Sequence, residues 1–586
     1  MNKIVILLVA LWALVSCSKT EKTKHPNVVL ILSDDQGWGD LSMNGNSNIN
    51  TPNIDKLAKS GVTFDQFYVC PVCSPTRAEL LTGRYHVRGG VYSTSTGGER
   101  LDLDETTIAQ VFKQAGYATA AYGKWHNGMQ PPYHPNARGF DDFYGFCSGH
   151  WGNYFSPMLE HNGKIVTGDG YLTNDLTNHG INFIEKNKEK PFFLYLPFNI
   201  PHAPMQVPDR WWNEFANKEI KMRNRDPEKE DVEFTRAALA MCENVDWNVG
   251  RILAKLDELD LTENSIIIYL SDNGPNSWRW NGGMKGRKGS TDEGGVRSPM
   301  CMKWQGKFIA GKKVTEIAGA IDFLPTLADL AGIDFQFKKP LDGVSLKPLL
   351  MEKNPEWKER YIFSYWRNKT SVRSQKYRLD NNGQLFDMET DPGQRKNVAA
   401  EHPEIEKTLM AARENWNKSV LSELPKIDNR PFPIGDPDFN FTQIPARDGV
   451  AHGNIVRSAR PPNCSFFTEW TSLTDSITWN AEVLAEGDFD VDVYYTCPAA
   501  DTGAVFQLSF AGEQLTAKIT KANDPPLTGM ENDRVPRTES YVKAFKPLHA
   551  GTIHLKKGKG TLTLKALKIP GKQVMDFRLM MFHRKN

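Results

Sequence analysis

The sequence predicts an α/β protein: a doubly wound, mostly parallel sheet flanked by helices, then a small α+β subdomain and an appended β-sandwich. Four short apolar runs have the pattern of fully buried strands, and helical patterns separate them; the runs are residues 27–32, 117–122, 191–196 and 265–270. Strands that alternate with helices favour a parallel sheet. After residue 489 apolar and polar residues alternate, which is typical of half-buried strands in a sandwich.

Capping residues and helical spacing predict three helices in the first part of the chain. Thr51 and Pro52 supply an N-cap and a proline at the first helical position, so a helix begins there. Residues 103–116 form an amphipathic pattern that a glycine ends, and residues 235–259 form a longer helical pattern. The glycine-rich stretch 139–150 predicts a loop.

The second half of the chain has shorter elements. Strand patterns from residue 361, among them residues 385–388, precede a helix that runs through Trp416. The proline-rich stretch 424–462 predicts a linker that wraps the surface. The strands of the sandwich are expected at residues 489–495, 505–510, 561–567 and 574–580.

The composition gives no indication of a nucleic-acid partner. The 586 residues include 71 Lys and Arg against 70 Asp and Glu, which leaves a net charge of +1. A chain of this length with 40% hydrophobic residues can build a large core. No internal stretch is long and apolar enough to span a membrane.

The N-terminus has the features of an export signal. Lys3 precedes an apolar run at residues 4–15, which is too short for a membrane span and right for a secretory signal. Residues 14–18, Leu-Val-Ser-Cys-Ser, resemble a bacterial lipobox in which Cys17 is acylated after cleavage. We therefore expect an exported protein, periplasmic or at the cell surface, whose only membrane contact is a lipid anchor. An ordinary signal peptide with an incidental Cys17 is the alternative.

The cysteines are too few for a disulfide scaffold in so long a chain. The sequence has eight: Cys17, Cys70, Cys73, Cys147, Cys242, Cys301, Cys464 and Cys497. Cys464 and Cys497 lie in the same C-terminal region, so a bond between them is open at this point.

Polar residues follow each of the four apolar runs. Parallel sheets bind ligands at the carboxyl ends of their strands, so these side chains are expected to meet in one site. Taken singly, each has an ordinary explanation as a turn, a solvated charge or a hydrogen-bonded histidine. The residues are Asp34 and Asp35, Lys124 and His126, His202, and Asp272 and Asn273.

The segment around Cys73 carries the most specific pattern. Pro75 restricts Ser74 to extended conformations, so Cys73 is expected on an extended segment just ahead of a helix. A helix N-terminus favours a bound anion, and Arg77 is close enough in sequence to reach back to it. The alternative is that Cys70 and Cys73 form a redox-active C-x-x-C pair.

Cys-Ser-Pro-Thr-Arg at residues 73–77, with Leu-Thr-Gly-Arg at 81–84, resembles the signature of type I sulfatases of the alkaline phosphatase superfamily. In that family the cysteine is oxidised after translation to formylglycine, whose hydrate supplies the nucleophile. The resemblance covers residues 27–420 and is closest to bacterial polysaccharide sulfatases of the arylsulfatase B kind. Further matching motifs are Gly-Lys-Trp-His at 123–126, Pro-His-Ala-Pro at 201–204, Asp-Asn-Gly at 272–274 and Arg-Lys at 287–288 before Glu-Gly-Gly at 293–295.

The resemblance over residues 27–420, together with the N-terminal and C-terminal patterns described above, predicts the domain boundaries. They are a lipoprotein signal peptide at 1–17, a sulfatase catalytic domain at 26–350, a C-terminal sulfatase subdomain at 351–423, a linker at 424–462 and a β-sandwich accessory domain at 463–586.

The resemblance also implies a calcium site. All its protein ligands are oxygen donors, as calcium prefers, together with the formylglycine oxygen at position 73. The implied ligands are Asp34, Asp35, Asp272 and Asn273.

Catalytic roles follow position by position from the same family. Arg77 would stabilise the ionised hydrate, while Lys124 and Lys288 would bind the sulfate oxygens. His202 is the expected general acid for the leaving alcohol, and His126 the expected base that releases sulfate. Ser148 and His150 are expected on the substrate side.

The expected function is hydrolysis of sulfate esters on a polysaccharide or oligosaccharide such as ulvan, carrageenan or a glycosaminoglycan. A formylglycine-generating enzyme is then required as a maturation partner. Two alternatives stay open: a phosphatase or phosphonate monoester hydrolase of the same superfamily, and a non-catalytic glycan-binding lipoprotein if Cys73 is not converted.

Overall fold

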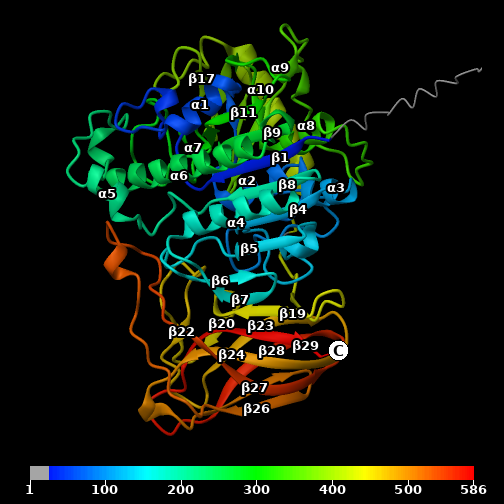
Figure 1. Cartoon of the computed structure of the whole chain (residues 1–586), viewed down its shortest axis with the longest axis vertical. Coiled ribbons are helices and arrows are strands. Elements are labelled where there is room, and N and C mark those ends of the chain that lie inside the picture. The colour runs from blue at the N-terminus through cyan, green and yellow to red at the C-terminus, as the bar shows by residue number, and fades with distance from the viewer. Residues whose placement is uncertain (1–24, 426, 586) are drawn as a thin grey trace, which may run out of the picture.

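The protein consists of an α/β body and a smaller all-β body (Figure 1). The computed structural model describes residues 25–425 and 427–585, so the predicted signal peptide and Cys17 lie outside the described residues. The predicted α/β fold class is confirmed: a large central sheet, parallel in its middle and mixed at its edges, lies between helices, and the C-terminal part forms β-sheets.

The four predicted buried strands form the centre of the large sheet. They lie side by side in the order β9, β1, β8, β4, and all three contacts between them are parallel. Every residue of these strands is buried, because helices cover both faces. Their bounds are β1 (Asn27–Ser33), β4 (Ala118–Lys124), β8 (Phe192–Pro197) and β9 (Ser265–Ser271).

Antiparallel strands extend this sheet at both edges, so that it has ten strands. Strand β11 (Met300–Trp304) runs antiparallel to β9, and β2 (Val62–Phe64) and β12 (Lys312–Val314) follow it. At the other edge, β6 (Met158–His161) and β7 (Lys164–Thr167) form a hairpin. This hairpin faces the all-β body (Figure 1).

The stretch 139–150 is only partly the loop that its glycines predict, because it contains strand β5 (Asp142–Phe146), which pairs with β4. Its Gly145 has a φ of 148°, and a Cβ there would lie 2.1 Å from the carbonyl oxygen of Gly123. The glycine is therefore needed for the close approach of two strands as well as for a turn.

Helices pack on both faces of the sheet because alternate residues of each strand point to opposite sides. Val29 and Ile31 of β1 pack on the face covered by α1 (Pro52–Ser60), α4 (Leu172–Asn187) and α6 (Val232–Glu258). The opposite face carries α2 (Cys73–Thr82), α3 (Ile108–Gln114), α8 (Phe323–Leu330) and α9 (Lys347–Met351).

Helix α3 is shorter than the predicted pattern at 103–116. Thr107 is its N-cap and forms a capping box with Gln110, so the helix begins only after Thr107. The predicted helices at 51 and at 235–259 are confirmed as α1 and α6, with the bounds given above.

The small subdomain consists of one antiparallel sheet and one helix. The sheet contains β14 (Ile362–Trp366), β15 (Lys369–Arg373), β16 (Tyr377–Leu379) and β17 (Leu385–Asp387), in that order, and α10 (Pro403–Val420) packs beside it. A buried ion pair of 2.8 Å between Arg378 and Glu293 joins it to the main body. The strands and the helix expected here are present.

The prediction of a linker at 424–462 is wrong, because this stretch contributes strands to the all-β body. Four short strands pair with later ones: β18 (Phe432–Ile434), β19 (Phe441–Pro445), β20 (Val450–His452) and β21 (Val456–Arg457). Strand β18 lies at the edge of its sheet, where Pro433 is tolerated although it cannot donate a backbone hydrogen bond.

Two sheets then pack face to face as the predicted sandwich. One contains β23 (Ser476–Val483), β25 (Val505–Phe510), β26 (Glu513–Lys518) and β28 (Gly558–Lys568); the other contains β22 (Phe467–Thr468), β24 (Gly487–Thr496), β27 (Lys546–Leu555) and β29 (Asp576–Arg584). Trp470, Trp479 and Phe577 fill the space between them. Cys464 and Cys497 are both free buried thiols, so the disulfide left open above is not formed.

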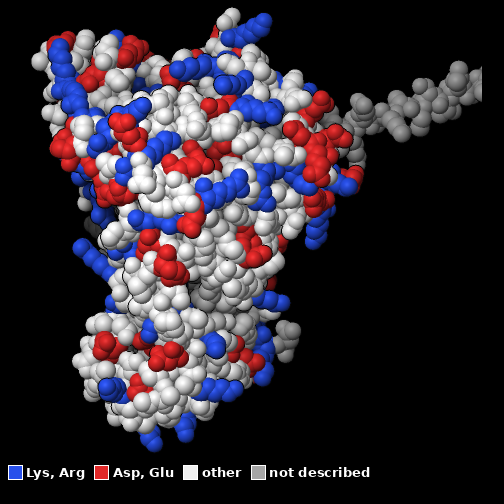
Figure 2. Space-filling view, turned by 60° about the vertical axis from the view of Figure 1, so that its left-hand side comes forward, with Lys and Arg blue, Asp and Glu red and all other residues white. Residues whose placement is uncertain are grey.

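Acidic and basic side chains are intermingled over the face of the molecule in Figure 2, in keeping with the net charge of +1. Within residues 25–425 and 427–585, no helix is both long enough and apolar enough to cross a membrane.

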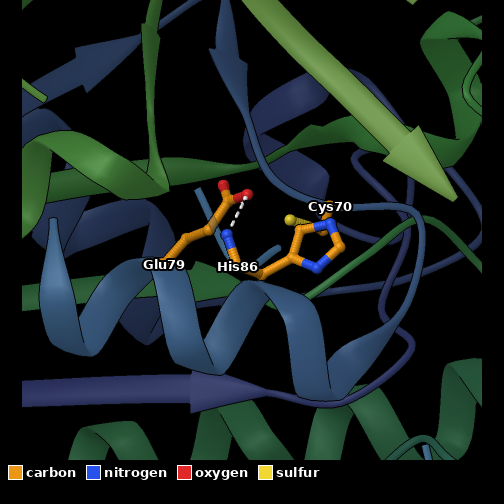
Figure 3. Close-up of side chains that lie close together, drawn as sticks. All are labelled: Cys70, Glu79 and His86. Atoms are coloured by element: carbon orange, nitrogen blue, oxygen red, sulfur yellow. Dashed lines mark hydrogen bonds between the residues drawn. The ribbon is translucent and has the colours of Figure 1, made fainter. Parts of the chain in front are cut away.

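A small cluster of titratable groups is buried against helix α2 (Figure 3). The backbone N–H of His86 donates to the Glu79 carboxyl at 3.2 Å, and His86 Nδ1 lies 2.6 Å from the carbonyl of Val91. Burial raises the pKa of Glu79 to about 8, lowers the pKa of His86 to about 4 and raises the pKa of Cys70 well above its usual value. These groups are therefore uncharged at neutral pH.

The protonation of Glu79 makes stability depend on pH. In the unfolded chain Glu79 ionises near its ordinary pKa of 4.5, whereas in the folded protein it keeps its proton up to about pH 8. The folded state thus binds more protons between these values, and this contribution to stability is present below pH 4.5 and lost as pH rises through 8. Glu79→Gln is expected to flatten this fall, measured as the urea midpoint across this pH range. Glu404→Gln, at an exposed position of α10, should keep the wild-type slope; equal slopes for wild type and Glu79→Gln would contradict the assignment.

Candidate active site

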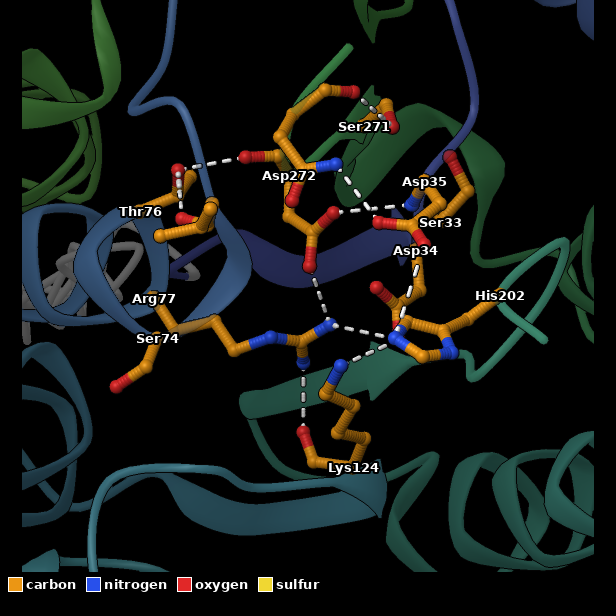
Figure 4. A network of polar contacts seen from close by, with 12 residues as sticks. Ser33, Asp34, Asp35, Ser74, Thr76, Arg77, Lys124, His202, Ser271 and Asp272 are labelled. Atoms are coloured by element: carbon orange, nitrogen blue, oxygen red, sulfur yellow. Dashed lines mark hydrogen bonds and ion pairs between the residues drawn. The ribbon is translucent and has the colours of Figure 1, made fainter. Parts of the chain in front are cut away.

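The sequence-predicted residues converge at the carboxyl ends of β1, β4 and β9, beside the N-terminus of α2 (Figure 4). Asp34 and Asp35 follow from β1, Lys124 ends β4, and Asp272 follows β9. The backbone holds the strand ends together, since Asp272 N–H donates to the Ser33 carbonyl at 3.1 Å. The site therefore depends on the parallel register of the central strands.

Cys73 is the first residue of helix α2, with Val72 as N-cap in an extended conformation. The expectation of Cys73 ahead of the helix is thus wrong by one position, because Pro75 still falls in the first turn, where proline is tolerated. Cys73 is 3% exposed, and burial raises the pKa of its thiol. An unmodified Cys73 is therefore protonated at neutral pH and a poor nucleophile.

Two carboxylates lie close to Cys73, and a third, Asp35, is hydrogen-bonded beside them. Ligand atoms of Asp34, Cys73 and Asp272 lie within 4.8 Å of one another. The backbone N–H of Asp35 donates to Asp272 Oδ1 at 3.1 Å, and Asn273 Nδ2 donates to Asp35 Oδ1 at 2.8 Å. Asp35 has a φ of 67°, a left-handed conformation that Asp adopts more readily than most residues.

Three cations face these carboxylates. Lys124 Nζ lies 2.6 Å from Asp34 Oδ2, and Arg77 Nη2 lies 2.8 Å from Asp272 Oδ2. Lys288, from the glycine-rich loop after β9, lies 2.6 Å from Asp35 Oδ1. Although burial alone would raise it, Lys288 holds the pKa of Asp35 well below its usual range. The two ends of the Arg77 guanidinium are fixed, because Nη1 also donates to the Lys124 carbonyl at 2.7 Å.

The carboxylates still have capacity for a metal ion. Asp34 Oδ1 and Asn273 Oδ1 are buried without a hydrogen-bond partner among the described residues. Burial and the neighbouring Asp34 raise the pKa of Asp272 to about 6, which shows mutual repulsion that a cation would relieve. Carboxylate and amide oxygens are the ligands of a hard divalent cation, so the residues present fit calcium.

His202 lies at the open side of this cluster. Its Nδ1 is 2.7 Å from the carbonyl of Ala203 and so carries a proton, while its Nε2 is 3.7 Å from Asp35 Oδ2. Burial and the nearby Lys288 lower the pKa of His202 to about 4. In the protein without substrate, Nε2 is therefore unprotonated at neutral pH.

His126 is held through its other ring nitrogen, Nε2. Its Nε2 lies 2.8 Å from the carbonyl of Thr94 and must carry the proton, which leaves Nδ1 as a free acceptor; Nδ1 is buried and has no partner among the described residues. Burial, together with Lys124, keeps the pKa of His126 well below its usual value. The ring is thus a neutral base with one available lone pair.

His150 and Ser148 lie beside these histidines. The His150 ring stacks on the His202 ring with centroids 5.8 Å apart, and His150 Nε2 is buried without a partner among the described residues. Ser148 is buried nearby in the same segment. Between them, Gly149 permits close packing, because a Cβ there would lie 2.5 Å from His126 Nε2. All twelve predicted residues are thus placed in one region of the structure.

Sequence reasoning missed a group of residues that hold this edge of the site. Asn463 Nδ2 lies 3.3 Å from His150 Nδ1, and Arg447 donates to Asn463 Oδ1 at 3.1 Å. Arg447 also forms a buried ion pair with Glu99. Arg447 falls in the supposed linker and Asn463 outside the family resemblance, so no motif pointed to either of them.

Comparisons with known proteins identify the family of two parts of the chain. The family model "Sulfatase" matches residues 26–333, which is more than half of the chain. A second model, "N-sulphoglucosamine sulphohydrolase, C-terminal", matches residues 288–419 and thus the small subdomain.

Individual relatives extend over the same part of the chain. N-acetylgalactosamine-6-sulfatase of Mus musculus is 31% identical over 428 residues, which cover 65% of this chain and 78% of that protein. The uncharacterized sulfatase YdeN of Escherichia coli is 29% identical and covers 70% of this chain and 88% of its own. The crystal structure of Ps i-CgsB in complex with k-i-k-neocarrahexaose has a TM-score of 0.61 at 34% identity, covering 67% of this chain and 93% of that one. From its site, its fold and these matches, the chain belongs to the sulfatase family.

Proposed function

We propose that this sulfatase hydrolyses sulfate esters of carbohydrates, with a nucleophile formed from Cys73 and a calcium ion held beside it. The observation that carries the proposal is the position of Cys73, at the N-terminus of α2, beside the carboxylates of Asp34 and Asp272, in a cluster that Asp35 and three cations complete. A carbohydrate substrate is supported by relatives: one is an N-acetylgalactosamine-6-sulfatase, and one solved structure contains k-i-k-neocarrahexaose.

The surroundings of Cys73 suit its conversion to formylglycine. The hydrated aldehyde would supply a hydroxyl that attacks sulfur, which the buried, protonated thiol cannot do. Both Cys70 and Cys73 are free thiols, so no disulfide blocks the conversion. Arg77 stabilises negative charge at this position, since its guanidinium is fixed between Asp272 and the Lys124 carbonyl. The conversion requires a formylglycine-generating enzyme as partner.

Asp34, Asp35, Asp272 and Asn273 would hold the calcium ion together with residue 73. The ion would polarise the nucleophile and the sulfate oxygens. Charge supports this assignment: three carboxylates balance Arg77, Lys124 and Lys288, so a divalent cation leaves two positive charges. A sulfate ester and an ionised hydroxyl together carry two negative charges, which matches that excess.

Lys124 and Lys288 bind and orient the sulfate group. Each ammonium lies on one carboxylate, at 2.6 Å, with donors left over for sulfate oxygens. Because Lys124 is fully buried, its charge acts in a low dielectric, where it stabilises developing charge more strongly than in water.

The two histidines divide the proton transfers. His202 is the general acid: its Nδ1–H is occupied by the Ala203 carbonyl, so the proton for the leaving alcohol must come from Nε2. A bound sulfate ester places negative charge beside this ring, which raises its pKa and favours the protonated form. His126 is the base, because its Nδ1 is the free lone pair.

We further propose export and lipid anchoring through Cys17, to the periplasm or the cell surface. The support is the apolar run at residues 4–15 and the Leu-Val-Ser-Cys-Ser motif at 14–18. A sulfated polysaccharide would reach such a protein outside the cytoplasm.

The first prediction from this proposal concerns the nucleophile. In protein made together with a formylglycine-generating enzyme, the peptide that contains Cys73 should lose the mass that separates a thiol from an aldehyde. Cys73→Ala should lower turnover of a sulfate ester by a factor on the order of 10⁶, as for removal of a hydrolase nucleophile. Cys301→Ala, at another buried free thiol, should stay active. Retained activity in Cys73→Ala, or faster hydrolysis of aryl phosphate than of aryl sulfate, would overturn the proposal.

The second prediction concerns calcium. Adding calcium to chelator-treated protein should raise the thermal unfolding midpoint, with a stabilisation of about 2.7 kcal/mol at a hundredfold excess over Kd. Asp34→Asn should lose most of this shift, because it removes a charged ligand with a free buried oxygen. Asp40→Asn is the matched control, since Asp40 is equally buried but pairs with Arg279 at 2.7 Å. Equal shifts in both variants would place calcium elsewhere.

The third prediction concerns His202. A general acid matters most for a poor leaving group, so His202→Ala should lower kcat for a sugar sulfate by about 10²–10⁴-fold. For 4-nitrophenyl sulfate, whose phenolate leaves without a proton, the loss should be much smaller. His179→Ala, at a partly exposed position of α4, should change neither rate. An equal loss on both substrates would show that His202 only binds the sulfate.

A further inference from the structure

A cavity of about 700 Å³ lies where the α/β body meets the sandwich. Its walls come from the segment around Trp151, from the β6–β7 hairpin, from β24 and β29, and from the segment 528–547. The last of these is tied to the α/β body: Gln206 pairs with Asp533 in an isolated bridge, and Arg534 donates to the Val207 carbonyl at 2.7 Å. In Figure 1 this orange segment rises from the sandwich beside the α/β body.

Arg578 of β29 lines this cavity as a buried cation without a counterion. It is 3% exposed, its guanidinium lies over the Trp151 ring at 5.2 Å from the centroid, and Nη1 donates to the Ser465 carbonyl at 2.6 Å. Among residues 25–425 and 427–585, no carboxylate lies within ion-pair distance of Arg578 and its other N–H groups have no hydrogen-bond acceptor. Burial lowers the pKa of Arg578 to about 10, so it remains charged at neutral pH.

The other charged groups of the wall leave Arg578 as the attractive centre. Lys543 is neutralised by Asp576, at 2.7 Å. Glu531 is exposed, and its carboxylate accepts from the backbone N–H of Gly529 in its own turn, at 3.1 Å. A buried guanidinium has a high desolvation cost, which an anionic ligand with several oxygens would offset.

The remaining walls suit a sugar. Phe155, Tyr494 and Phe545 line the cavity with aromatic side chains, while the Trp151 ring supports Arg578. Aromatic faces pack on the C–H faces of sugar rings, and the volume is in the range of small-ligand sites. The cavity thus combines one unpaired cation with apolar, planar surfaces.

We propose that this cavity is a second binding site for the sulfated saccharide, with a sulfate ester on Arg578 and the sugar against the aromatic walls. The inference rests on the proposed function, because it names the same class of substrate. The wall of the cavity is also adjacent in sequence to the candidate active site. Trp151 directly follows His150, and the His150 ring stacks on His202. The saccharide segment in the cavity is therefore one that is not being cleaved, and the site favours long chains over single sugars.

The test measures binding apart from turnover. In full-length protein that carries Cys73→Ala, Arg578→Met should weaken binding of dextran sulfate about tenfold in affinity gels, the size of one lost charged contact. Binding of unsulfated dextran should not change. Arg584→Met is the matched control: Arg584 lies on the same strand, sits over Phe489 at 4.8 Å and donates to backbone carbonyls, but it does not line the cavity. It should bind dextran sulfate like the parent protein.

A second variant separates binding from folding. Val542→Trp fills the cavity from its wall and leaves Arg578 in place, so it should cause the same loss. Unchanged binding of dextran sulfate by a folded Arg578→Met or Val542→Trp protein would overturn the proposal. Polygalacturonate, a carboxylated saccharide, is the comparison ligand. Variants that lose binding to polygalacturonate but keep binding to dextran sulfate would also overturn the proposal. If the wild-type protein hydrolyses no sulfate ester, but Arg578→Met still weakens the binding of dextran sulfate, only the proposed function is overturned.

Discussion

The site depends on the mutual neutralisation of charges buried at the end of a parallel sheet. Asp34, Asp35 and Asp272 are carried into the interior by β1 and β9, where an isolated carboxylate would not stay ionised. Lys124, Lys288 and Arg77 each form an ion pair with one of these carboxylates, and each cation comes from a different element. Removing one partner leaves a buried charge uncompensated, so strands, helix α2 and the loop at Lys288 are held in place by the same interactions that arrange the chemistry.

The sequence was sufficient for the centre of the protein because two strong signals agree there. The four apolar runs are fully buried strands, and the polar residues after them have no role in a sheet interior, so a shared site at the strand ends was the consistent interpretation. Seven candidate residues followed from this pattern, including His126, whose lone pair only the structure identifies, and the other five came from the family resemblance.

The incorrect predictions concern features that depend on tertiary contacts or on weak local patterns. Strands β18 to β21 have five residues or fewer, and β18 and β19 each contain a proline, so no periodicity is visible; these strands form by pairing with later ones. Arg447 and Asn463 reach the site through tertiary contacts from the all-β body, which no local pattern encodes. The start of α2 at Cys73 differs from expectation because a proline in the first turn does not delay a helix.

The burial of Cys73 has a consequence for the order of events in the cell. A side chain that is 3% exposed, at the first residue of α2 and facing the ends of the central strands, cannot enter the active site of another enzyme. If Cys73 is oxidised as proposed, the oxidation must come before the sheet closes, while residues 73–84 are still an extended peptide. A Cys73 thiol that has not been oxidised when the protein folds is then inaccessible to the oxidising enzyme. That molecule stays inactive.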